Sequence, residues 1–335
     1  IISSPKIIEY RFKAEFVASF NPKFEPINRL GQRKKGNFNW VIDLDEYILI
    51  DKEIFNKVRR VYDYSLSLGL NSYDLKKQIG DLRYLTVKHY QDQSMLIITS
   101  YNKDERFNEV IDFAIKQGFN SVYWLVNNSL HDSFEGEINK FEGLENLKIN
   151  IKFNNKVFTF LIGPFTFFQN NIFGFEKLLE YIDSSLTKIN TTQLNLYDLY
   201  CGVGVLGISL ANRFKSITGI EIVQDSIDLA IQNQKLNKII DNIEFKCFDV
   251  KHVTLPQDME SVTIVDPPRT GLEDKGVSNV LDIGSKYIVY VSCNPITLAY
   301  DIQNLSNQYK ILDLKAFDMF PQTYHTECLC ILERY

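Results

Sequence analysis

Short apolar runs alternate with amphipathic stretches of helical length through the C-terminal half of the chain. Each run is rich in Val, Ile, Leu or Tyr and is short enough to be a buried strand. These predicted strands cover residues 194–200, 217–222, 243–248, 262–265 and 287–291. Because strands that alternate with helices form parallel sheets, this half is predicted to be a doubly wound α/β domain. Two last runs, 311–317 and 328–332, have no long helix between them and predict an antiparallel pair at the sheet edge.

The N-terminal half is less regular and predicts a smaller, mixed α+β domain. The predicted strands are 10–20, 40–45, 82–89, 94–99 and 121–126, and the predicted helices are 52–68 and 106–117. Residues 127–143 are polar and rich in turn-forming residues, and they carry no predicted strand. A chain of 335 residues exceeds the length at which one core usually stops growing. We therefore expect an α+β domain over residues 1–160 and an α/β domain over residues 161–335.

Composition narrows the class of protein. Apolar residues make up 45% of the chain and charged residues 24%, as in ordinary globular proteins. The longest nearly uncharged apolar stretch, 157–168, is too short to span a bilayer, and the first residues lack the apolar block of a secretory signal. Five cysteines, none in the first 200 residues, do not make a disulfide framework, and the scattered histidines argue against zinc. We expect a protein of the reducing cytoplasm with no metal and no membrane partner.

The distribution of charge qualifies the net charge of −5, which by itself argues against a nucleic-acid partner. Residues 1–160 carry 23 Lys and Arg against 21 Asp and Glu, a net of +2, while residues 161–335 carry 14 against 21, a net of −7. Arg29, Arg33, Lys34 and Lys35 gather around an expected glycine-rich turn in the first half. This cluster is either an ordinary solvated face or a patch that contacts phosphates.

A glycine-rich loop follows the first strand of the α/β half. Gly202, Gly204 and Gly207 match the G-x-G-x-x-G pattern, in which glycines let the backbone approach a ligand. Glu221 ends the next predicted strand, where a carboxylate can accept both ribose hydroxyls of an adenosine. NAD, S-adenosylmethionine and a plain tight turn all fit this pattern. Asp198 favours S-adenosylmethionine, because a carboxylate attracts that cofactor's ammonium group and repels a pyrophosphate.

Three further strand ends carry candidate chemistry. Asp249 follows the third strand, where it either contacts the adenine edge or caps the strand. Asp266 ends the fourth strand, and two prolines before Arg269 fix its direction at the ligand-binding edge of the sheet. Cys293 ends the fifth strand, before a helix that Asn294 can cap. A helix N-terminus favours a thiolate nucleophile there, and a small buried apolar cysteine is the alternative.

Two more segments carry polar residues beside apolar ones. Glu327 lies two residues after His325 and just before the last apolar run, and it is either a general base or a surface carboxylate. Phe167 opens the α/β half and fits a core position in isolation. Gln169 and Asn171 follow it and indicate a polar lining at a domain junction.

Taken together, these motifs resemble the RNA uridine-5-methyltransferases, which use S-adenosylmethionine on ribosomal or transfer RNA. The resemblance covers Phe167 to the C-terminus through Phe-Phe-Gln-x-Asn, Asp-Leu-Tyr-Cys-Gly-x-Gly, Asp-Pro-Pro-Arg, Ser-Cys-Asn-Pro and His-x-Glu-Cys. It extends weakly to residues 10–16 and 41–45. It implies a Rossmann-like class I methyltransferase domain in which the Cys293 thiolate attacks carbon 6 of uracil. Glu327 would then remove the carbon 5 proton.

The resemblance also assigns binding residues. It places Gln169, Tyr200, Glu221 and Asp266 at the cofactor, where Gly202, Gly204 and Asp249 join them from the loop and strand-end patterns. Phe167 would stack on or wall the target base, which must be unpaired or flipped out. Arg269, together with Arg33, Lys34 and Lys35, would contact the RNA.

Two departures from the family pattern matter. Many members carry Asn or Thr where this chain has Val205, which removes one polar contact to the cofactor. Many also bind an iron–sulfur cluster through four cysteines, and the place of the last one falls on Tyr47. We therefore predict no iron–sulfur cluster. We expect no fused N-terminal RNA-binding barrel, common in the family, within these 335 residues, and no obligate protein partner is indicated.

Several alternatives remain beside an enzyme that methylates carbon 5 of uridine in RNA. A relative acting on another base or on DNA is one, although cytosine enzymes would carry a Pro-Cys motif that Ser292-Cys293-Asn294 lacks. A dehydrogenase is disfavoured, because no convincing hydride-handling His or Lys pair accompanies the glycine loop. A non-catalytic RNA-binding protein would not need both Cys293 and Glu327. The sequence leaves ribosomal RNA and transfer RNA equally open.

Overall fold

In the computed structural model, which describes residues 1–23, 25–239 and 241–335, the chain forms two units with separate cores. The N-terminal unit comprises Ile8–Leu147 and Gly163–Phe165. The C-terminal unit comprises Ile1–Ile7, Lys148–Ile162 and Thr166–Tyr335. The division expected between residues 160 and 161 differs from this one, because the first seven residues and the segment from 148 to 160 pack with the C-terminal unit.

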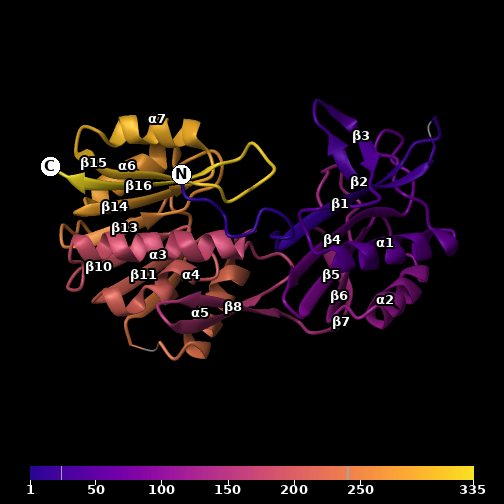
Figure 1. Cartoon of the computed structure of the whole chain (residues 1–335), viewed down its shortest axis with the longest axis horizontal. Helices are drawn as coiled ribbons and strands as arrows, with labels where there is room; N and C mark the ends of the chain where they lie inside the picture. Colours follow the sequence, from indigo (N-terminus) through magenta and orange to yellow (C-terminus); the bar gives the residue numbers. More distant parts are fainter. Residues whose placement is uncertain (24, 240) are drawn as a thin grey trace. The chain divides into compact units, whose positions relative to one another are not determined.

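A seven-stranded sheet in the order β3-β2-β1-β4-β5-β6-β7 forms the centre of the N-terminal unit (Figure 1). Its strands are β1 (Lys13–Phe20), β2 (Asn28–Lys34), β3 (Asn37–Asp43), β4 (Leu82–Tyr90), β5 (Gln93–Ser100), β6 (Ser121–Val126) and β7 (Glu137–Gly143). Among the strands named here, as far as the structure describes them, β5 and β6 pair in parallel and the other neighbours pair antiparallel. Helices α1 (Lys52–Ser67) and α2 (Arg106–Lys116) cover the sheet over a core that includes Phe16, Phe55 and Trp124. The predicted mixed α+β architecture is confirmed.

Two elements of the N-terminal unit differ from the prediction. The expected glycine-rich turn is strand β2 over most of its length, and only Lys35 and Gly36 form the turn to β3. Gly31 pairs with both neighbouring strands. Strand β7 lies in the stretch that carried no predicted strand. None of its residues is buried, so the apolar alternation that marks a strand is missing there.

A second seven-stranded sheet, in the order β12-β11-β10-β13-β14-β16-β15, forms the C-terminal unit (Figure 1). Its parallel strands are β10 (Asn195–Leu199), β11 (Ser216–Glu221), β12 (Ile243–Cys247), β13 (Ser261–Val265) and β14 (Tyr287–Ser292). Strands β15 (Tyr309–Phe317) and β16 (Glu327–Arg334) complete the sheet as an antiparallel edge pair. This topology confirms the predicted doubly wound sheet and its edge pair.

The helices of this unit follow from the strand order. They are α3 (Ile172–Lys188), α4 (Val205–Ser209), α5 (Gln224–Leu236), α6 (Glu273–Ile283) and α7 (Pro295–Leu305). Because parallel crossovers are right-handed, the reversal of strand order between β10 and β13 puts α4 and α5 on one face and α6 and α7 on the other. The carboxyl ends of β10 and β13 therefore flank the switch point where such sheets bind ligands. None of the described helices is long and apolar enough to cross a bilayer.

The hairpin of β8 (Leu147–Phe153) and β9 (Lys156–Ile162) was not predicted, and side-chain amides attach it to α5. Asn233 is fully buried on α5. Its Oδ1 accepts from the Leu161 N–H at 2.6 Å, and its Nδ2 donates to the Val203 carbonyl at 3.1 Å. Asn237, one turn later, both donates to and accepts from the Thr159 backbone, at 2.7 and 2.9 Å. The two amides thus bond to backbone groups of β9 that a neighbouring strand would otherwise pair with. Asn233 also connects the hairpin to the glycine loop through its bond to Val203.

We expect Asn233→Ala to lower the free energy of unfolding by about 2–3 kcal/mol, because it leaves a buried N–H and a buried carbonyl without partners. Urea denaturation of the full chain, monitored by circular dichroism, measures this loss. Gln232→Ala is the matched control, since Gln232 is an exposed neighbour on the same helix. Equal stabilities of the two variants would contradict the role of Asn233.

Candidate active site

The glycine loop leaves β10 in a backbone conformation that few residues adopt. Gly202 and Gly204 have φ values of 53° and 81°, and Tyr200 has a φ of 62° although it is not a glycine. A Cβ atom on Gly204 would lie 2.7 Å from the Phe245 ring, so only glycine fits there. A Cβ on Gly202 would meet no atom within 4 Å. The backbone at Gly202 therefore faces open space in which a ligand can lie against it.

Asp198, whose carboxylate the sequence predicts near a cofactor's ammonium group, lies beneath the glycine loop and holds it in place. Its side chain is 1% exposed, and its Oδ2 accepts from the Gly207 N–H at 2.9 Å. Burial raises the pKa of this carboxyl to about 7. Asp198 thus fixes the first turn of α4 against β10, and it is not presented to a ligand.

Glu221 is oriented by three backbone N–H groups at the end of β11. Its carboxylate accepts from Gly202 at 3.1 Å, from Ile222 at 2.9 Å and from Val223 at 3.0 Å. The side chain is therefore fixed beside the glycine loop. Asp249 accepts from the Lys251 N–H at 2.9 Å, which is the geometry of a strand-end cap, and its carboxylate remains partly exposed.

A cavity lies between the glycine loop, the end of β13 and the segment before α3. It is lined by Phe167, Phe168, Gln169, Phe175, Tyr200, Cys201, Gly202, Val203, Val205, Leu206 and Asp266. Gln169 Nε2 donates to Asp266 Oδ2 at 3.2 Å. Asp266 is enclosed except on the cavity side, and this desolvation raises the pKa of its carboxyl to about 7. The buried Tyr200 hydroxyl has no hydrogen-bond partner among the described residues.

These residues fit S-adenosylmethionine. The desolvated Asp266 carboxyl lacks a cationic partner within the described chain, and the cofactor carries an ammonium and a sulfonium group that would provide one. Glu221 is placed to accept ribose hydroxyls, and the bare backbone at Gly202 allows close approach. Val205 is a buried, apolar part of the wall, as its departure from the family pattern predicts.

The register of β14 against β16 brings Cys293 and Glu327 together. Ser292 pairs with Cys328 across these antiparallel strands, so Cys293 and Glu327 follow at the adjacent position. Glu327 is 5% exposed, and burial together with the nearby Asp266 charge raises its pKa well above the usual value for a glutamate. Its carboxyl is therefore harder to ionise than that of an ordinary glutamate.

Cys293 has the helical neighbour that the sequence predicted, but not the expected pKa. Asn294 caps α7 by accepting from the Ile296 N–H at 3.1 Å. Burial and the Glu327 charge nevertheless raise the pKa of the Cys293 thiol, while Arg269 lowers it. The sequence predicts that the helix N-terminus favours a thiolate, whereas desolvation of the partly buried thiol opposes it in the ligand-free protein.

Hydrogen bonds connect the loops around Cys293. Asn294 Nδ2 donates to the Arg269 carbonyl at 3.0 Å, and the Arg269 guanidinium donates to His325 Nδ1 at 3.2 Å. The Asp-Pro-Pro-Arg, Ser-Cys-Asn-Pro and His-x-Glu-Cys motifs therefore meet in one place. Phe167 is 67% exposed at the cavity, which leaves its ring available to a base.

Three expectations need correction or remain predictions. Asn171 is fully buried and caps α3 by accepting from Gly174 at 2.9 Å, so it is not part of a polar lining. Arg29 is buried and donates to the carbonyls of Pro26 and Val41, which removes it from the basic cluster. No group of three or more His, Cys, Asp or Glu residues in the described chain could hold a metal, and the absence of an iron–sulfur cluster remains a prediction.

The basic residues of the hairpin differ in their exposure. Lys34 and Lys35 are exposed, whereas Arg33 forms a 2.6 Å ion pair with Asp132. The sequence did not reveal this acidic partner, which lies about a hundred residues further along the chain.

Asp266 predicts how the stability of the ligand-free protein varies with pH. Its folded-state pKa lies above the unfolded value, so the folded state holds the proton between about pH 4 and 7 and stability falls as the pH rises through that range. We expect the stability of Asp266→Asn to fall less steeply as the pH rises. The part of the fall that remains would come from Asp198, whose pKa is also raised. Urea unfolding at pH 5, 6, 7 and 8 measures the effect, and the exposed Asp282→Asn variant is the control. Parallel pH profiles for wild type and Asp266→Asn would contradict the assignment.

Comparison with known proteins places this geometry in a family. A family model described as tRNA (Uracil-5-)-methyltransferase matches residues 139–259 and 246–335. An uncharacterized RNA methyltransferase of Nanoarchaeum equitans is 32% identical over 340 residues, which cover 100% of this chain and 71% of that protein. A tRNA (uracil(54)-C(5))-methyltransferase of Pyrococcus furiosus is 29% identical over 337 residues, which cover 100% of this chain and 76% of that protein.

A solved structure agrees with the whole architecture. The crystal structure of Pyrococcus abyssi tRNA (uracil-54, C5)-methyltransferase in complex with S-adenosyl-L-homocysteine matches with a TM-score of 0.82 and 27% identity, over 99% of this chain and 77% of that one. The predicted fold class, family and S-adenosylmethionine cofactor are confirmed by these similarities. The chain belongs to the tRNA (uracil-5-)-methyltransferase family and is an S-adenosylmethionine-dependent RNA (uracil-5-)-methyltransferase.

Proposed function

We propose that this enzyme methylates carbon 5 of an unpaired uridine through a temporary covalent bond between Cys293 and carbon 6 of the uracil. The observation that carries this proposal is the β14–β16 register, which sets a cysteine beside a buried carboxyl, with both groups near Asp266 of the cofactor cavity. A thiol and a carboxyl in that position match the two protein groups that the reaction requires.

The residues divide the reaction into balanced steps. The Cys293 thiol gives its proton to solvent water and the thiolate adds to carbon 6, which moves the electrons of the carbon 5–carbon 6 double bond into an enolate. Bound S-adenosylmethionine would supply the methyl group that carbon 5 takes, and S-adenosylhomocysteine would leave. The carboxylate form of Glu327 removes the carbon 5 proton, the double bond re-forms, and the carbon–sulfur bond breaks to release Cys293 as a thiolate.

The raised pKa values of Cys293 and Glu327 are compatible with these steps. Because Glu327 is harder to ionise than an ordinary glutamate, it places less negative charge beside Cys293 while the thiolate forms. A carboxyl whose pKa is raised towards the working pH is also a stronger base than an ordinary glutamate. All five cysteines are free in the structure, and a reducing cytoplasm would keep Cys293 a thiol.

The remaining site residues would bind cofactor and RNA. Asp266 and Gln169 would hold the amino-acid end of S-adenosylmethionine, Glu221 would accept its ribose hydroxyls, and Tyr200 and Asp249 would border it. Phe167 would cover the target base. Arg269, Arg33, Lys34 and Lys35 would face RNA phosphates, because they are the cations at the catalytic edge and on the β2–β3 hairpin.

A structured RNA with an unpaired uridine is the substrate class that this site would accept, since the reacting ring must leave its base stack. Transfer RNA is the first substrate to test, because the Pyrococcus relatives are tRNA (uracil(54)-C(5))-methyltransferases. Ribosomal RNA is the alternative substrate.

Cys293→Ala should abolish covalent trapping on RNA that contains 5-fluorouridine, because fluorine blocks proton removal and leaves the wild-type adduct in place. Denaturing gel electrophoresis detects the adduct, and mass spectrometry of the cross-linked peptide locates it. Cys247→Ala is the matched control, since Cys247 is a partly exposed thiol at the end of β12. Trapping that persists in Cys293→Ala would exclude this cysteine as the nucleophile.

Glu327→Gln should form the adduct on ordinary RNA but release it slowly, because an amide cannot accept the carbon 5 proton. We expect turnover to fall by about a hundredfold or more, with adduct accumulating in a single-turnover experiment. Glu333→Gln on the same strand should behave like the wild type. Turnover of Glu327→Gln at the wild-type rate would assign the base to another group.

A further inference from the structure

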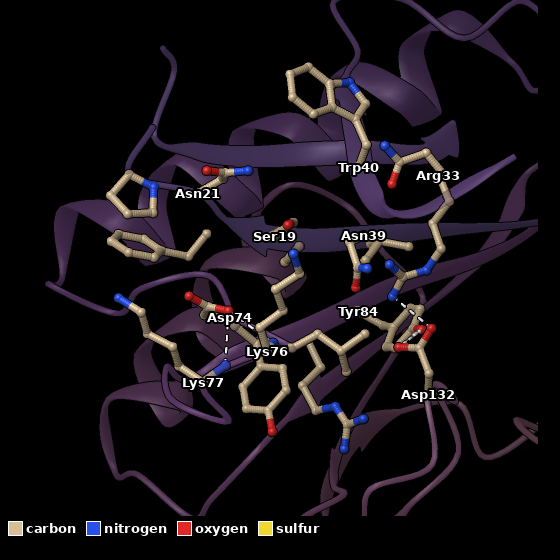
Figure 2. Close-up of a pocket in the computed structure, with 18 of the residues that line it drawn as sticks. Ser19, Asn21, Arg33, Asn39, Trp40, Asp74, Lys76, Lys77, Tyr84 and Asp132 are labelled. Carbon is tan, nitrogen blue, oxygen red and sulfur yellow. Dashed lines mark hydrogen bonds and ion pairs between the residues drawn. The ribbon is translucent and has the colours of Figure 1, made fainter. Parts of the chain in front are cut away.

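A second cavity, of about 600 Å³, lies within the N-terminal unit. Its walls come from the end of β1 and the loop after it, from the β2–β3 hairpin, and from the segment Tyr73–Lys77. Figure 2 shows Trp40 and Arg33 on one side of this space and Asp74, Lys76 and Lys77 on the other. The volume is within the range of pockets that bind small molecules, and none of the residues proposed for methyl transfer lines it.

The cavity presents an aromatic ring together with side-chain amides. Trp40 is partly buried, and the Arg29 guanidinium lies 4.8 Å from its ring centre, which supports the ring from the protein side. Asn39 is exposed beside it, and Asn21 lines the cavity from the loop after β1. An indole face with nearby amides is the combination that stacks on a nucleobase and bonds to its edge.

The charge of the lining is positive. Five cations and two carboxylates give a net charge of +3, and they are Lys23, Arg33, Lys76, Lys77 and Arg83 against Asp74 and Asp132. Both carboxylates are engaged within the protein. Asp132 accepts from Arg33 and from the Tyr84 hydroxyl, each at 2.6 Å, and Asp74 accepts from the N–H groups of Lys76 and Lys77 at 2.9 and 3.2 Å.

Three of the cations are available to an anion. Within the described part of the chain, the ammonium groups of Lys23, Lys76 and Lys77 have no carboxylate within 4.0 Å. All three side chains belong to exposed residues. A phosphate at the mouth of the cavity would therefore replace water at these lysines without breaking an existing ion pair.

The floor of the cavity is rigid. Arg83 is 2% exposed and donates to three backbone carbonyls, those of Asn127, Ser129 and His131, at 2.6–3.0 Å. Its guanidinium also lies 5.0 Å from the Tyr73 ring centre. Its Nε atom is buried without a hydrogen-bond partner in the described structure. A site that is organised before its ligand arrives loses little entropy on binding.

We propose that this cavity binds one unpaired nucleotide of the substrate RNA, different from the uridine that is methylated. The base stacks on Trp40 with Asn39 at its edge, and the phosphate lies near Lys76 and Lys77. The proposal rests on the proposed function in one respect only, namely that the substrate is an RNA with unpaired nucleotides. A free nucleotide carries the same chemistry and is the alternative that the test separates.

The test uses the full chain and fluorescence anisotropy of labelled tRNA at several salt concentrations. Asn39→Ala with Trp40→Ala should weaken binding by about tenfold, as expected for the loss of one stacked base. Lys76→Gln with Lys77→Gln changes only exposed residues, and it should reduce the magnitude of the slope of log K against log salt by about 0.7, the contribution of one phosphate contact of a single strand. The second variant keeps the test valid if the first one folds poorly.

The matched control is Lys103→Gln with Lys116→Gln, which removes the same charge from exposed residues of the same unit outside the cavity. It should leave the RNA affinity within twofold of the wild type, and it should leave the slope of log K against log salt unchanged. Wild-type RNA affinity in the two cavity variants would overturn the proposal. So would quenching of Trp40 fluorescence by uridine monophosphate while the RNA affinity of the cavity variants is unchanged, because that result assigns the cavity to a free nucleotide.

The covalent adduct on 5-fluorouridine RNA separates this proposal from the proposed mechanism. At saturating RNA, the cavity variants should form as much adduct as the wild type, since Cys293 and Glu327 are unchanged. If the wild type forms no adduct, the mechanism fails while the anisotropy data still decide the cavity. If the adduct forms normally and the variants bind RNA like the wild type, the cavity proposal alone fails.

Discussion

The antiparallel pairing of β16 with β14 is the constraint on which the proposed catalytic site depends. In a parallel sheet the carboxyl ends of all strands lie at one edge. The end of one strand therefore never lies beside the start of its neighbour. Reversing the last strand brings two such ends together, and it sets Glu327, at the start of β16, next to Cys293, at the end of β14. The reaction that we propose needs these two groups on one uracil ring.

Repulsion between buried carboxylates links the cofactor cavity to the proposed catalytic pair. Asp266 and Glu327 are desolvated and near each other, so each disfavours the ionised form of the other, and Asp198 lies buried beneath the adjacent loop. A cationic ligand in the cavity would reduce this repulsion, because its positive charge stabilises the ionised carboxylates. Binding of a positively charged cofactor would therefore lower the pKa of both carboxyls and favour the carboxylate form that the proposed base needs.

The sequence predicted the C-terminal sheet well because its central strands β10, β13 and β14 are buried on both faces and its motifs fall at the strand ends. It missed β7, which is exposed, and the β8–β9 hairpin, which side-chain amides attach to α5. Motif spacing also identified which residues would meet, but not their ionisation. Burial raises the pKa of the Cys293 thiol and hides Asp198, and neither effect is visible without the packed structure.

Release of tritium from RNA labelled at carbon 5 of uridine tests the central claim most directly, because only substitution at that carbon removes that hydrogen. Purified protein is incubated with the labelled tRNA and with S-adenosylmethionine carrying a carbon-14 methyl group, and both labels are followed over time. The account predicts one tritium released for each methyl group transferred. Methyl transfer without tritium release would place the methyl group on another atom and contradict the account.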